Sequence, residues 1–184
     1  MRYPVAETAE KHARILEEAS RLFRERGFSG VSVSEIMKAT GLTHGPFYNH
    51  FDSKEELMVE SVLQGFKSTL DGLHATEGTA RGRAEYVKRY LSAGHRNAPG
   101  MGCTMASLSS EIRHEPKVKG AFTDRLKAVI EAVTAHFPWP SKRSARGDAI
   151  RMMASMVGAM ILARAVEDER FSDEILSEVR KGLV

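Results

Sequence analysis

Apolar residues recur along the chain at the three- and four-residue spacing of helices that bury one face. The stretch from about 7 to 26 carries such a stripe, formed by Ile15, Leu16, Ala19, Leu22 and Phe23. A longer stripe follows between about 53 and 75, formed by Leu57, Val59, Val62, Leu63, Phe66, Leu70 and Leu73. No segment shows the period-two alternation of β-branched residues that marks a strand. The pattern predicts an all-α protein of about nine helices.

Breaks containing glycine, proline and polar residues divide the rest of the chain. They lie at 76–82, 97–102 and 138–140. Between and after them, helices are expected at about 83–97, at about 103–114, from Pro116 to the last break, and at about 142–168 and 172–182.

Residues 31–57, VSVSEIMKATGLTHGPFYNHFDSKEEL, predict two short helices joined by a tight turn. Ser32 and Glu35 form a capping box at the start of a helix at about 32–40. Gly41 supplies the left-handed residue that ends this helix. A second capping box, Ser53 with Glu56, opens the long helix that follows.

The second short helix, at about 44–50, is expected to face outward. Thr43 suits its N-cap, and Pro46 falls in the first turn, where a missing N–H costs little. Phe47 and Phe51 are assigned to the core beneath it, while the other positions carry small, hydroxyl, aromatic and imidazole side chains. A helix exposed in this way is available to an outside partner, and a DNA groove is the leading candidate.

This segment resembles the DNA-binding domain of the TetR family of bacterial transcriptional regulators. The resemblance covers about residues 8–57 and rests on ILEEASRLFRERGF, SVSEIMKATGL, THGPFYNHF and the SKEEL at 53–57. Pro46 departs from the family, where a second glycine is more usual, and should stiffen the start of its helix. The resemblance implies a TetR-like fold. A three-helix helix-turn-helix domain would occupy 1–52 and an effector-binding and dimerisation domain 53–184, with the long helix as the link.

The function implied is a ligand-responsive repressor that binds a palindromic operator as a homodimer. Tyr48 and Thr43 suit phosphate or thymine-methyl contacts, and Lys54 brings an ammonium to a helix start. Arg2, Lys11, Lys38 and the N-terminal arm are further candidates. The candidate DNA-binding residues are Ser32, Ser34, Thr43, His44, Gly45, Pro46, Tyr48, Asn49, His50 and Lys54.

Net charge adds little to this interpretation. The formal charge of +3 suits a polyanionic partner. Residues 1–70, however, hold nine Lys or Arg against ten Asp or Glu. The face on which the cations lie must therefore matter more than their number.

With 184 residues and 42% hydrophobic content, the chain is long enough for a real core in one or two small domains. It begins without a charged and then apolar leader, and no stretch approaches the ~20 apolar residues of a membrane helix. A single cysteine excludes an intrachain disulfide framework and fits a reducing compartment. We expect a cytoplasmic protein with no membrane partner.

The last two helices are expected to form the dimer. Ser155, Ala159 and Ala163 make a small-residue strip that lets another helix approach closely, and the final helix has an apolar face that includes Phe171, Ile175, Leu176 and Val179. The alternative is that both faces pack inside one subunit. In the family that the chain resembles, the same two helices make the dimer.

An effector pocket is implied by the resemblance, with Phe66, Cys103, Met105, Phe122, Met152 and Met156 as its candidate lining. Methionine adapts to irregular cavities, although each of these could equally be ordinary core. Cys103 sits at an expected helix start, where the dipole favours the thiolate. A cysteine-based sensor of oxidants or electrophiles is therefore an alternative version of the same regulator, and an inert buried thiol is the other.

Other function classes have weaker support. Glu111 and His114 bring an acid and an imidazole close together, but no P-loop, nucleophile elbow, dinucleotide fingerprint or HExxH accompanies them. His44 and His50 are six positions apart on the expected helix, which puts them on different faces, and no metal or cofactor is expected. We do not expect an enzyme. A helical adaptor that has lost DNA binding stays open as an alternative.

Overall fold

The computed structural model describes residues 5–43 and 45–184, except for the side chains of Val5, Ala6 and Pro46. His44, Arg2 and the rest of the first four residues, all expected near DNA, lie outside the described residues. The described part of the chain folds into helices, turns and loops without a strand, as the all-α prediction requires. None of its helices has the length and apolar character needed to cross a bilayer.

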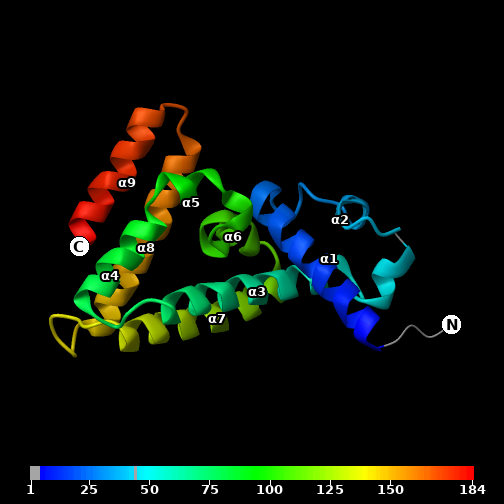
Figure 1. The fold of residues 1–184 in the computed structure, drawn as a ribbon, viewed down its shortest axis with the longest axis horizontal. Coiled ribbons are helices and arrows are strands. Elements are labelled where there is room, and N and C mark those ends of the chain that lie inside the picture. The colour runs from blue at the N-terminus through cyan, green and yellow to red at the C-terminus, as the bar shows by residue number, and fades with distance from the viewer. Residues whose placement is uncertain (1–4, 44) are drawn as a thin grey trace.

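Three elements build one end of the molecule (Figure 1). They are α1 (Val5–Arg26), α2 (Val33–Ala39) and the 3₁₀-helix η1 (Gly45–Asn49). Large side chains fill the space that these elements enclose, and each is no more than 2% exposed: Ile15, Phe23, Phe28, Ile36, Phe47 and Phe51. Burial of several aromatic rings explains how so small a unit is stabilised.

The long helix α3 (Lys54–His74) leaves this end and runs beside α7 (Pro116–His136), as Figure 1 shows. The Phe66 ring on α3 meets the Phe122 ring on α7, with centroids 5.2 Å apart. The α3 helix also packs against α1. It therefore contacts both halves of the molecule, and its predicted bounds of about 53–75 are confirmed.

The other end is built from α4 (Ala80–Tyr90), α8 (Ala145–Ala165) and α9 (Glu169–Leu183). Between the ends lie α5 (Ala93–Asn97), the 3₁₀-helix η2 (Pro99–Met101) and α6 (Thr104–Ile112), of which α6 contacts α1, α3, α7 and α8. Arg96, only 8% exposed, fastens α5 to α9 by donating to Asp173 Oδ1 and Ser172 Oγ, both at 2.7 Å.

The predicted second helix of the helix-turn-helix pair has a different form. An α-helix at about 44–50 was expected, and the described residues show a 3₁₀-helix of five residues instead. The N–H groups of His50 and Phe51 both donate to the Phe47 carbonyl, at 2.9 and 3.1 Å, so the element closes within a turn. Short 3₁₀ segments suit a stretch that contains proline and lacks room for a second turn.

The predicted helix at 83–97 is also wrong in detail, because it divides into α4 and α5. Leu91 leaves the helical backbone with ψ 53°, and Ser92 Oγ accepts a hydrogen bond from the His95 N–H at 3.2 Å as the cap of α5. The ring Nδ1 of His95 lies 2.7 Å from the Tyr90 carbonyl and takes the place of a helical partner there. A serine inside an apparently continuous helix was the signal for this break.

Candidate nucleic-acid interface and effector cavity

The start of α2 is held by the predicted capping box. Ser32 Oγ accepts from the Glu35 N–H at 3.2 Å, and Glu35 Oε2 accepts from the Ser32 N–H at 2.8 Å. The Ser32 N–H, its hydroxyl and Arg26 together lower the pKa of Glu35 to about 2. The carboxylate is therefore ionised at neutral pH, and the Ser32 hydroxyl is committed to the fold.

A tight turn follows α2. Gly41 has φ 69°, the left-handed conformation that glycine adopts without strain, as predicted. The Leu42 N–H donates to the Met37 carbonyl at 3.1 Å and closes the helix end. This turn sets the angle at which η1 leaves α2.

The η1 helix has one buried and one exposed side. Phe47 is fully buried and Phe51 is 1% exposed, with stacked rings 5.6 Å apart, which confirms their assignment to the core. Tyr48 is 62% exposed on the outer side, and Thr43, Gly45 and Asn49 are exposed as well. The buried rings hold the outer side chains in place.

Two predicted DNA contacts have partners inside the protein. His50 is half-buried with its ring 6.3 Å from His12, and burial lowers its pKa, with the nearby His12 and Lys11 adding to the effect. Lys54 Nζ donates to the Phe28 carbonyl at 2.6 Å and lies 5.9 Å from the centroid of the Phe23 ring. Lys54 therefore helps to hold α1 against the start of α3.

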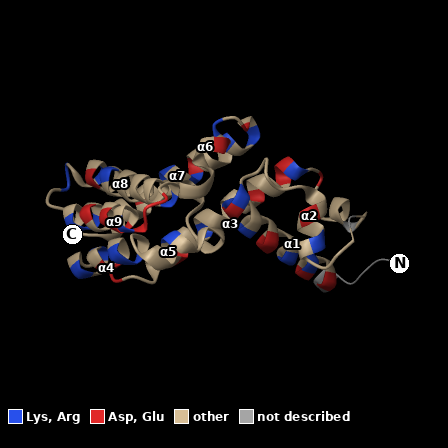
Figure 2. Ribbon diagram, turned by 90° about the horizontal axis from the view of Figure 1, so that it is seen from above, with Lys and Arg blue, Asp and Glu red and all other residues tan. Residues whose placement is uncertain are grey.

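Charges of both signs alternate along α1, as Figure 2 shows. Arg21 bonds both Glu18 and Glu25, and Arg26 bonds Glu35 across to α2. Exposed cations near the turn and η1 are Arg14 and Lys38. The cations of α1 therefore serve partly as intramolecular partners.

Two contacts join this end to the rest of the molecule. Arg24 on α1 donates through Nε and Nη2 to the Gly100 carbonyl in η2, at 2.8 and 2.5 Å. Glu111 on α6 accepts from the Ser29 N–H at 3.2 Å, and its carboxylate fills the space beside Gly27. Gly27 has φ 76°, the left-handed conformation that favours glycine, and a Cβ there would displace the Glu111 carboxylate.

A cavity of about 540 Å³ opens beside the Arg24 contact. Its walls come from α3, from α4 and from the segment that leads through η2 into α6, and include Tyr86, Tyr90 and Cys103. Cys103 is 7% exposed at the N-cap of α6, and its N–H donates to His95 Nε2 at 3.2 Å.

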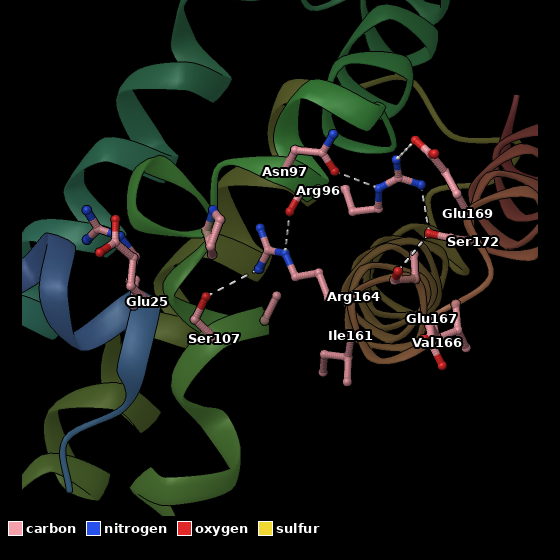
Figure 3. Close-up of a pocket in the computed structure, with 14 residues that line it drawn as sticks. Glu25, Arg96, Asn97, Ser107, Ile161, Arg164, Val166, Glu167, Glu169 and Ser172 are labelled. Atoms are coloured by element: carbon pink, nitrogen blue, oxygen red, sulfur yellow. Dashed lines mark hydrogen bonds and ion pairs between the residues drawn. The ribbon is translucent and has the colours of Figure 1, made fainter. Parts of the chain in front are cut away.

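A second cavity, of about 570 Å³, lies between α1, α5, α6 and the last two helices. Figure 3 shows Arg164 at its centre, donating to the Arg96 carbonyl at 3.1 Å and to Ser107 Oγ at 3.3 Å. Three carboxylates line this cavity, those of Glu25, Glu167 and Glu169. Its lining therefore carries charges of both signs.

Residues 15–60 match the model of the family described as bacterial regulatory proteins of the tetR family. This stretch of the chain is therefore similar to the N-terminal domain of TetR-family regulators. The repressor DhaR of Mycobacterium sp. strain GP1 is 33% identical over 100 residues, covering 53% of this chain and 50% of the relative. The repressor KstR2 of Rhodococcus jostii strain RHA1 is 42% identical over 72 residues, covering 38% of this chain and 35% of the relative. The match thus spans half or less of either relative.

Solved structures extend the likeness of fold to nearly the whole chain. The reduced form of E. coli NemR superposes with a TM-score of 0.78 at 21% identity, covering 95% of each chain. A TetR-family regulator from Agrobacterium tumefaciens gives 0.75 at 23% identity, covering 95% of this chain and 98% of the other. The predicted TetR-like fold is confirmed.

The predicted lining residues of the effector pocket do not gather around one cavity. Cys103 lines the cavity beside Arg24, and Phe122 lines a separate shallow groove on α7. Phe66, Met105, Met152 and Met156 are buried, at most 4% exposed, as ordinary core. The spacing of methionines along α8 indicated a buried face and could not show whether that face meets a cavity.

Two of the three residues of the small-residue strip on α8 face into the subunit, and the third, Ser155, is exposed. Ala159 and Ala163 are 3% and 2% exposed, and the Ala163 carbonyl accepts from Ser172 Oγ of α9 at 2.7 Å. Leu176 is 3% exposed, and Ile175 and Val179 are half-buried against the core. Ser155 and Phe171 alone among the predicted interface residues are exposed. The strip lets α9 approach α8 within one chain, which corrects the prediction for the two alanines and Leu176.

Sequence reasoning missed the exposed side of α8, which carries Ile150, Ala154, Ile161 and Leu162. It also missed Arg24, Tyr86, Arg89 and Tyr90 as neighbours of Cys103 in the cavity. Aromatic residues recurring at Tyr86 and Tyr90 on α4 were the available signal. No local sequence pattern predicts that α1 contacts η2.

Lys54→Met should destabilise the chain, because it leaves the Phe28 carbonyl without its donor. We expect a loss of about 1–2 kcal/mol in the free energy of unfolding, measured by urea titration. Lys38→Met, on the exposed side of α2, is the matched control and should change stability by less than about 0.5 kcal/mol. Equal effects of the two substitutions would show that the internal contact of Lys54 is unimportant.

Proposed function

We propose that this chain is a ligand-responsive transcriptional repressor that binds a palindromic operator as a homodimer. The observation that carries the proposal is the outer side of η1, where polar and aromatic side chains stand on two buried phenylalanines within a TetR-family domain. Helix-turn-helix proteins insert their second helix in the major groove, with two half-sites about one helical turn apart. DhaR and KstR2 are both described as transcriptional repressors.

The proposed contacts follow from exposure. Tyr48, Asn49, Thr43 and Gly45 face outward and are assigned to bases and phosphates, with Ser34 and Lys38 on α2 as neighbours. Pro46, His50, Lys54, Ser32 and His44 remain candidates from the sequence. A neutral His50 would offer a hydrogen bond rather than a charge. The DNA target implies a place in the bacterial cytoplasm, where the chromosome lies.

We further propose the division into a DNA-binding domain at 1–52 and an effector domain at 53–184. The α3 helix packs against both α1 and α7 and would link the domains mechanically. The bonds of Arg24 to Gly100 and of Ser29 to Glu111 add a second link. An effector would act by preferring one of two arrangements of these links, because only a difference in affinity between states can shift their populations.

The exposed side of α8 supports a homodimer. Ile150, Ile161 and Leu162 are 43%, 42% and 57% exposed, while the opposite side of the same helix is buried in the subunit. At Gly158 a Cβ would meet no atom within 4 Å, so a helix of a second copy has room to approach there. Contiguous exposed apolar side chains mark interaction surfaces. Phe171 at the start of α9 is 49% exposed and would extend this surface.

A cysteine-based sensor is the second candidate, and the surroundings of Cys103 favour it. Cys103 lies at the start of α6, and the guanidinium groups of Arg24 and Arg164 both interact electrostatically with it. Addition of the Cys103 sulfur to an electrophilic carbon would place the new group in the cavity that Cys103 lines.

Tyr48→Ala should weaken binding to a palindromic promoter fragment by about tenfold or more. Tyr48→Phe separates the two roles of the side chain, since it keeps the ring and removes the hydroxyl. Gel shifts at two salt concentrations would measure both, with dimer mass and thermal midpoint as controls. Wild-type affinity in Tyr48→Ala would reject the assignment of η1 as the recognition element.

Leu162→Glu should convert the dimer into monomers, because it places a charge in an apolar interface. Sedimentation equilibrium would report the change in mass, and operator affinity should fall with it. Val184→Glu, at another exposed apolar residue, is the matched control and should stay dimeric. A Leu162→Glu protein that keeps the wild-type mass would exclude this side of α8 as the interface.

Cys103→Ser tests the sensor. If the candidate is right, benzoquinone or hypochlorite releases the wild-type protein from its operator, and the serine variant stays bound. Mass spectrometry of the treated wild type should locate the modification on Cys103. Release of both proteins at the same dose would dismiss the cysteine and leave the repressor proposal intact.

A further inference from the structure

Among the described residues, the cavity beside Arg24 is lined by positively charged side chains and by no negatively charged ones. Fourteen described residues line it, and none of them is Asp or Glu. Two guanidinium groups, those of Arg24 and Arg89, belong to the lining. The cavity of Figure 3 differs, because its arginines are accompanied by three glutamates. Of these two cavities, the one beside Arg24 therefore has the electrostatic preference for an anion.

Both of its arginines are bound to neutral oxygens. Arg24 donates to the Gly100 carbonyl, and Arg89 Nη2 donates to the Gly72 carbonyl and to Thr76 Oγ1, both at 3.0 Å. The Glu25 carboxylate interacts electrostatically with Arg24 but is bound by Arg21 at 2.8 Å. Burial lowers the pKa of the Arg24 guanidinium, and the charge of Glu25 offsets this only in part. A carboxylate, which accepts two parallel N–H bonds, is the natural partner of such a group.

The remaining walls suit a flat apolar body. Tyr86 is 6% exposed and Tyr90 is half-buried, on successive turns of α4, and Gly65 and Gly72 face them from α3. A Cβ at Gly72 would meet nothing within 4 Å, so this wall leaves open space for a ring. Met101, 82% exposed, lies at the edge of the cavity.

The hydroxyl of Tyr90 is the third polar element. It is buried beside the Cys103 thiol, a weak hydrogen-bonding group, and has no other polar partner within the described part of the chain. Burial raises the pKa of Tyr90, and raises that of Tyr86 to about 12, so both phenols keep their protons at neutral pH. A protonated phenol can donate to an anion, and an unsatisfied buried hydroxyl favours any ligand that accepts from it.

We infer that this cavity binds an aromatic carboxylate. The carboxylate accepts hydrogen bonds from Arg24 and from the Tyr90 hydroxyl, and the aromatic ring lies between α3 and α4. The role of this ligand as the effector rests on the proposed repressor function. Arg24 lies on α1, so a carboxylate that draws it away from the Gly100 carbonyl loosens the bond between the DNA-binding end and η2. Ligand binding and operator affinity are then linked through one side chain, and each lowers the other.

The test uses the full chain and three probes, which are benzoate, trans-cinnamate and 2-naphthoate, each paired with its neutral carboxamide. Calorimetry without DNA should show saturable binding of at least one carboxylate, and at least about tenfold weaker binding of its amide. Arg24→Gln should lose a similar factor. Tyr90→Phe, which keeps the ring and the fold, should weaken binding several-fold. Arg81→Gln, an exposed arginine on the same helix as Tyr90, should bind as the wild type does.

Failure of all three carboxylates to bind, or equal binding of acid and amide, would overturn the inference while operator binding by the protein still stood. A carboxylate that binds but leaves operator affinity unchanged would overturn the link through Arg24. Conversely, carboxylate binding by a protein that binds no DNA would refute the repressor and leave the ligand site established. Gel shifts with and without the binding probe separate these results.

Discussion

The bond between the Arg24 guanidinium and the Gly100 carbonyl connects parts of the chain 76 residues apart. It lies where the end of α1 meets η2, and Glu111 braces the same region through the Ser29 N–H. The end formed by α1, α2 and η1 is oriented by this polar junction together with the packing of α3. A ligand that competes for the Arg24 donor would therefore act directly on that orientation.

The two cavities and Cys103 all lie beside this junction. Arg24 lines both cavities, Cys103 opens α6, and α6 ends near the loop that precedes α2. Whether the signal is a bound carboxylate or a modified thiol, it arises at the start of α6 and reaches α1 over a short distance. Either signal would therefore change the position of η1 relative to the second η1 of the proposed dimer.

Three cations at this end of the molecule are already bound to groups of the protein itself. Arg21 and Arg26 are occupied by glutamates, and Lys54 by a carbonyl, so these cations add less to DNA affinity than their number indicates. In the proposed dimer, affinity for DNA would then come from the exposed residues of η1 and from the presence of two copies. A dimer that contributes little general attraction to phosphates loses binding sharply when the spacing of its recognition elements changes.

Features encoded within a few residues were predictable. The Ser32–Glu35 box, the left-handed Gly41, the buried pair Phe47 and Phe51, and the helix opened by Pro116 each depend on neighbours within about one turn. By contrast, α8 carries apolar residues on all sides, so its periodicity could not decide which side packs against α9 and which side stays exposed. The 3₁₀ form of η1, the internal bond of Lys54 and the cavity beside Arg24 were decided by tertiary structure alone. Each depends on groups distant in sequence whose distances, burial and charge exist only once the helices have packed.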